Sequence, residues 1–180
     1  MTLMGWWLVV TIVVVALGLW LWWTAHRLDQ MHHRIDVSRA SLDAQLLRRS
    51  GAALELATSD TLDPARSLLL LDAAHQARAA APDDLESAES DLSETLRAVL
   101  ADAAELTELR EHAEVGPLLA ELSGCARKVE LARRFHNDIV TSARTLRGRR
   151  RVRWLRLAGR AADLATIDLD DVPPPALVVD

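Results

Sequence analysis

The chain has 180 residues, a formal net charge of -5 at pH 7 and an apolar share of 50%, which suits one domain with a hydrophobic core. Its single cysteine excludes an intrachain disulfide and any metal site built from several cysteines. Five of the six tryptophans fall within the first 25 residues. The rest of the chain is rich in Leu and Ala, a composition typical of helical bundles.

The first predicted element is a transmembrane helix over residues 6–24. The stretch from Trp6 to Trp23 is uncharged over eighteen residues, and as a helix it is about 27 Å long, close to the hydrocarbon thickness of a bilayer. A cleaved signal peptide is disfavoured, because no basic residue precedes the run and WWTAHR is a poor cleavage site. Tryptophans at both ends are expected at the membrane interfaces: Trp6, Trp7, Trp20, Trp22 and Trp23.

The flanks of this helix predict its direction. Residues 1–5 contain no Lys or Arg, whereas Arg27, Arg34 and Arg39 follow the helix closely. Because positive flanks stay in the cytoplasm, we expect a single-pass membrane protein with its N-terminus outside. Residues 1–5 then lie outside the cell membrane and the bulk of the chain is cytoplasmic.

The cytoplasmic part, residues 25–146, is predicted to be an antiparallel helical bundle. Apolar residues at spacings of three and four indicate one helix over 25–58, continuous with the transmembrane helix, and a second from Pro64 to Ala81. The same spacing indicates a third helix from Asp83 or Asp84 to Val115 and a fourth over 118–146. Short connections make consecutive helices antiparallel. The expected fold is therefore all-α, an up-and-down bundle of about four long helices.

A basic segment, residues 147–166, follows the bundle. It contains seven arginines within fourteen residues, and on a helix its charged and apolar side chains separate onto two faces. Four helices return this segment to the membrane, which favours contact with anionic lipid at the cytoplasmic face. A solvated segment without a partner remains possible, and nucleic acid is less favoured because only Trp154 can stack on bases. The predicted interface residues are Arg149, Arg153, Trp154, Arg156 and Arg160.

The remaining tail, residues 167–180, contains three consecutive prolines. Proline cannot continue a helix, so the tail is expected to be extended or disordered.

No catalytic, cofactor or metal site is predicted. The six histidines form no i, i+4 pair, and Cys125 lies on an apolar stripe, where a buried thiol is far commoner than a nucleophile. The acids of the third helix fall mainly between its apolar positions and indicate a solvated face. These patterns favour a non-enzymatic protein.

Two stretches resemble the signatures of the LemA family. The first is LDAQLLRR, residues 42–49, and the second is ELSG, residues 121–124, followed by ARRFHND, residues 132–138. The chain departs from the family at His136, where the family usually has Tyr. The resemblance implies a membrane-tethered bundle of long antiparallel helices and adds no catalytic residue. The matching residues are Asp43, Gln45, Arg48, Arg49, Arg133, Arg134, Asn137 and Asp138.

These signature residues lead to one structural hypothesis and one functional prediction. Asp43 or Asp138 is expected to pair across helices with one of the four signature arginines. The predicted function is a scaffold at the inner membrane that binds an unidentified protein partner, with self-association left open. The alternative is a membrane-tethered regulator that binds nucleic acid or an acidic protein through residues 147–166.

Overall fold

The computed structural model describes residues 2–148 and 165–178, and all regular secondary structure in these ranges is helical, as predicted. The chain divides into two compact units. The first comprises Met1–Val37 with Ile139–Ala165, and the second comprises Ser38–Asp138 with Thr166–Asp180. Helices α1 (Thr2–Ala57) and α5 (Gly116–Gly148) each contribute to both units.

The first unit contains the apolar N-terminal part of α1. The described large apolar side chains from Trp6 to Trp23 are exposed. In the part of α5 that belongs to this unit, Val140 and Ala143 are buried. Within the described part of the chain, none of the helices has the length and apolarity that a membrane crossing requires.

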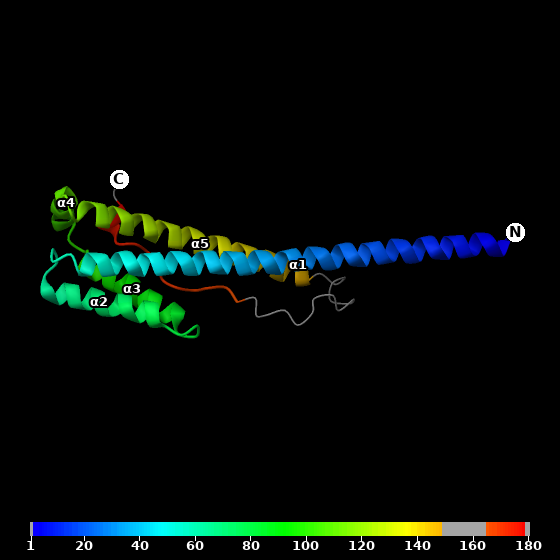
Figure 1. Ribbon diagram of the computed structural model, residues 1–180, viewed down its shortest axis with the longest axis horizontal. Coiled ribbons are helices and arrows are strands. Elements are labelled where there is room, and N and C mark those ends of the chain that lie inside the picture. Colours follow the sequence, from blue (N-terminus) through cyan, green and yellow to red (C-terminus); the bar gives the residue numbers. More distant parts are fainter. Residues whose placement is uncertain (1, 149–164, 179–180) are drawn as a thin grey trace. The chain divides into compact units, whose positions relative to one another are not determined.

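The second unit is an up-and-down helical arrangement. The C-terminal part of α1 runs in one direction, α2 (Pro64–Ala79) returns, α3 (Leu85–Val99) runs back, and α5 returns again (Figure 1). The short helix α4 (Ala103–Glu111) connects α3 to α5. A final short helix, α7, covers Pro175–Val178.

The starts of α2 and α4 follow from aspartate caps. Asp63 accepts hydrogen bonds from the backbone N–H groups of the second and third residues after it, and Pro64 takes the first helical position. Asp102 caps α4 in the same way. The prediction of one continuous third helix to Val115 is therefore wrong. Leu100 ends α3, and the backbone at Asp102 is extended.

The tail, residues 167–180, was predicted to be extended or disordered, and its described part, residues 167–178, is ordered, without regular secondary structure up to Pro174. Ile167 and Leu169 are buried in a core cluster with Leu42, Leu46 and Val129. Leu177 is buried in the larger cluster, which contains side chains of all the helices in this unit. The tail therefore supplies core side chains, although its prolines exclude a long helix.

Candidate functional site

A buried ion pair joins α1 to α3 at the centre of the second unit. Nη2 of Arg49 lies 2.5 Å from Oε2 of Glu89, and each side chain is only 2% exposed. Nη2 also donates to the backbone carbonyl of Glu89, and Nη1 donates to Oγ of Ser93 at 2.8 Å. Burial raises the pKa of the Glu89 carboxyl, and the positive charge of Arg49 offsets part of that rise.

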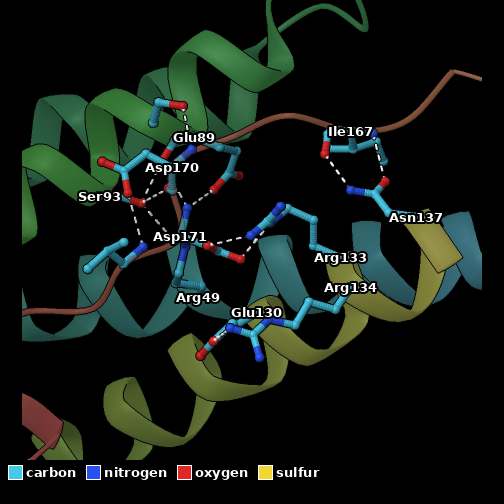
Figure 2. A network of polar contacts seen from close by, with 12 residues as sticks. Arg49, Glu89, Ser93, Glu130, Arg133, Arg134, Asn137, Ile167, Asp170 and Asp171 are labelled. Atoms are coloured by element: carbon cyan, nitrogen blue, oxygen red, sulfur yellow. Dashed lines mark hydrogen bonds and ion pairs between the residues drawn. The ribbon is translucent and has the colours of Figure 1, made fainter.

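Ser93 connects this ion pair to the tail. Its hydroxyl lies 2.6 Å from the backbone carbonyl of Asp170 and within hydrogen-bond distance of the carbonyl of Glu89 (Figure 2). One turn earlier on α3, Oγ of Ser90 accepts a hydrogen bond of 3.0 Å from the backbone N–H of Asp170. Two serines of α3 therefore bind both backbone groups of one tail residue.

Two arginines from different helices bind the neighbouring tail carboxylates. Arg133 of α5 donates from Nε and Nη2 to the two oxygens of Asp171, at 2.6 and 2.9 Å. Arg97 of α3 donates to Oδ2 of Asp170 at 2.5 Å and to the carbonyl of Val172 at 2.9 Å. The Arg97 hydrogen bond lowers the pKa of Asp170, and the Asp171 hydrogen bond raises the pKa of Arg133.

The start of the tail is held by an amide. Nδ2 of Asn137 donates to the backbone carbonyl of Ile167, and Oδ1 accepts from the backbone N–H of the same residue, both at 2.9 Å (Figure 2). Beyond Val172, Arg110 donates to the carbonyl of Ala176 and Ser123 donates to that of Leu177. The tail-binding groove, defined by Ser90, Ser93, Arg97, Arg110, Ser123, Arg133 and Asn137, holds the tail along its length.

The hypothesis that Asp43 or Asp138 pairs across helices with a signature arginine is wrong. Asp43 pairs with Arg39 one turn away on α1, and Asp138 is exposed. Arg49 and Arg133 do form ion pairs between elements, but with Glu89 and Asp171. The reason is geometric, because the side chain at position 49 points toward α3 and the one at 133 points toward the tail (Figure 2).

The other signature residues lie outside the tail-binding groove. Arg134 pairs with Glu130 one turn away on α5, and Arg48 is exposed. Gln45 is partly buried, and its Oε1 is buried without a hydrogen bond among the described residues. His136 is buried, with Nδ1 2.9 Å from Oγ of Ser38.

The five N-terminal tryptophans lie on α1 with exposed fractions between 39% and 69%: Trp6, Trp7, Trp20, Trp22 and Trp23. Trp22 stacks on the ring of His26, with centroids 5.9 Å apart. The other predicted membrane-contact residues lie outside the described residues: Arg149, Arg153, Trp154, Arg156 and Arg160.

Three further features concern metal binding, thiol reactivity and the shape of the surface. No group of three or more described His, Cys, Asp or Glu side chains is arranged to hold a metal ion. Cys125 is buried, and burial raises the pKa of its thiol, which disfavours the reactive thiolate. A groove of about 300 Å³ beside Glu89 is lined by side chains from α1 to α3, including Asp43, Leu46 and Leu85.

The residues missed from the sequence are those that meet the tail. Glu89 was predicted to lie on a solvated face, but it is buried. No contact was predicted from the sequence for Ser90, Ser93, Asp170 or Asp171. One signal was present: Arg97 and Arg110, the only cations on the acidic third helix, are the two that reach the tail from it. The alternation of Ile167 and Leu169 with acids was a second signal of an extended segment with one buried face.

The chain matches no protein-family model, no curated protein and no solved structure.

Proposed function

We propose that this chain is a divergent LemA-like protein of the bacterial inner membrane, anchored once by residues 6–24, with a non-enzymatic role as a cytoplasmic scaffold. The observation that carries the proposal is the exposed apolar surface of the first unit. Along α1 from Trp6 to Trp23, each described large apolar side chain is exposed. An apolar surface of this length is costly in water and favourable in lipid.

The aromatic residues support the same placement. Trp7 and Trp22 are fifteen positions apart and Trp6 and Trp23 seventeen, which is about 22 to 26 Å of helix, slightly less than the ~30 Å thickness of a hydrocarbon core. Indole rings favour the two interfaces of a bilayer. The apolar stretch from Trp6 to Trp23 also includes Leu21, whose side chain is not among those that the structure describes.

Cysteine labelling of intact cells tests the anchor and its direction. Native Cys125 is buried with a raised thiol pKa, so it contributes little background. With a membrane-impermeant maleimide, Thr2→Cys is expected to react in intact cells, whereas Asp60→Cys reacts only after permeabilisation. Recovery of the chain in the soluble fraction, or labelling of Asp60→Cys in intact cells, contradicts the proposal.

Residues 147–166 are proposed to contact anionic lipid on the cytoplasmic face. Their seven arginines and the positive flank of the anchor support this placement. Amide hydrogen exchange of this segment is expected to be slower in nanodiscs of anionic lipid than in neutral ones. Changing Arg149, Arg153, Arg156 and Arg160 to Gln should remove the difference. Protection that needs added DNA or RNA favours the alternative, a membrane-tethered nucleic-acid binder.

A further inference from the structure

We propose that the tail-binding groove is a recognition site for an extended acidic segment of another protein, and that the chain's own tail is a competing occupant. This inference rests on the proposed scaffold role and names the chemistry of the partner. The ligand class is a segment in which apolar residues alternate with acids, in the pattern of residues 167–171.

The tail is bound in the groove much as a separate peptide would be, through its backbone groups. The hydrogen bonds between the two come from side chains: Asn137 and Ser90 bind backbone groups of Ile167 and Asp170, and Ser93 and Arg97 bind tail carbonyls. Contacts to backbone groups do not depend on the sequence of the peptide. The main-chain path can therefore accept a different segment with the same extended shape.

The charges of the groove select the residue type. Arg133 of α5 binds Asp171 with two parallel hydrogen bonds (Figure 2). Arg97 of α3 binds Asp170. Planar guanidinium groups that hold carboxylates in this way are typical of acidic-motif recognition. Earlier in the tail, Ile167 and Leu169 are buried against Leu42, Leu46 and Val129, so the site next to the groove accepts apolar residues at alternate positions.

The tail can be displaced by mass action. One of its two carboxylate contacts is partly accessible, since the Arg97 and Asp170 side chains are 28% and 37% exposed, whereas Asp171 is buried. Because the tail belongs to the same chain as the groove, it competes as an intramolecular ligand, an advantage that a partner in dilute solution lacks. A partner segment must therefore bind more tightly than the tail, or belong to a protein that the scaffold already holds nearby.

Competition with a labelled peptide tests the inference in the full chain in detergent micelles. The probe is a fluorescent peptide of residues 165–178, read by anisotropy. Changing Asp170 and Asp171 to Asn in the chain weakens the internal tail, and the probe is expected to bind this variant at least about tenfold more tightly than the unmodified chain. Adding Arg133→Gln should abolish the gain, whereas Arg134→Gln should preserve it because Arg134 pairs within its own helix.

Three outcomes overturn the inference: equal binding to all the variants, no binding to any of them, or equal binding of a probe with both acids changed to Asn. Arg97→Gln provides a second groove variant, and far-UV circular dichroism confirms that each variant remains helical. If Ile167→Cys forms a disulfide with Asn137→Cys of a second molecule and the chain elutes as a dimer, the occupant is a second copy and an external partner is refuted. These measurements do not require membrane insertion, so their failure leaves the proposed anchor untouched, and the reverse also holds.

Discussion

The buried ion pair between Arg49 and Glu89 makes the sharpest prediction about stability. Arg49→Met leaves the Glu89 carboxyl buried without its cation, and Glu89→Leu leaves the guanidinium without its anion. Removing one partner of a buried pair costs about 3 to 5 kcal/mol. For a chain of this length, such a loss lowers Tm by roughly 10 °C.

The two single variants are expected to differ in their dependence on pH. Burial already raises the pKa of Glu89, and loss of Arg49 raises it further because the only lowering causes come from that arginine. A carboxyl with a raised pKa in the folded state stabilises the fold fully when the pH is below its unfolded-state pKa, which is about 4.3. That stabilisation is lost as the pH rises through the folded-state pKa. The deficit of Arg49→Met should therefore shrink by up to about 1.4 kcal/mol per unit as pH falls from 7 toward 5. A guanidinium cannot lose its proton in this range, and Glu89→Leu also removes the carboxyl that titrates, so the deficit of this variant should not shrink as pH falls.

Urea unfolding of the full chain in micelles, followed by far-UV circular dichroism, measures these differences. Tryptophan fluorescence is unsuitable, because no tryptophan lies in the second unit. The double variant Arg49→Met with Glu89→Leu removes both charges and is expected to recover most of the loss. A double variant as unstable as the sum of the two single variants refutes the coupling inferred from the 2.5 Å contact.

Three further predictions concern a glycine, a cap and a tail carboxylate. A Cβ added at Gly116 would lie 2.4 Å from the backbone oxygen of Arg110, so Gly116→Ala should destabilise the chain by about 1 to 3 kcal/mol in the same urea assay. Gly124→Ala is the control and should be neutral or stabilising, because a Cβ there meets nothing within 4 Å. Asp63→Ala removes two hydrogen bonds to the start of α2 and should cost about 1 kcal/mol, with Asp63→Asn retaining most of the stability. The pKa of Asp170 is lowered, so its contribution is complete above the unfolded value of about 3.9 and is lost as pH falls through the lower folded value. In an acid titration, Asp170→Asn should therefore differ from the unmodified chain at neutral pH and converge with it at the lowest pH, and a constant difference contradicts this reasoning.

Much of the helical architecture was predictable from local signals. Asp63 and Pro64 mark the start of α2, and the apolar spacing of α5 identifies its buried face. The break between α3 and α4 was missed because its apolar residues continue the same spacing. Asp102 with Glu105 three positions later was the sequence signal of a new helix start.

The candidate site was harder to predict because its pairs are distant in sequence. Arg49 was identified as a signature residue, but nothing in one sequence links it to Glu89 rather than to another acid. For the tail, composition left the extended and the disordered alternatives open. Three prolines and several acids are typical of disorder, yet Ile167, Leu169 and Leu177 are enough to place it in the core once the groove side chains bind its backbone.

The position of the tail in the core has a consequence for how the chain folds during synthesis. Leu42 and Leu46 are made first, Val129 later, and Ile167 and Leu169 later still, yet all five share one cluster. Contacts between residues so far apart form slowly, because a long loop must close first. Until residues 167–171 have been made, Arg133 and Asn137 lack the tail groups that they bind in the folded chain, and Leu42, Leu46 and Val129 are not covered by Ile167 and Leu169. Closure of this cluster is therefore a late step in the folding of the second unit, and before that step the proposed acidic partner meets no competing tail.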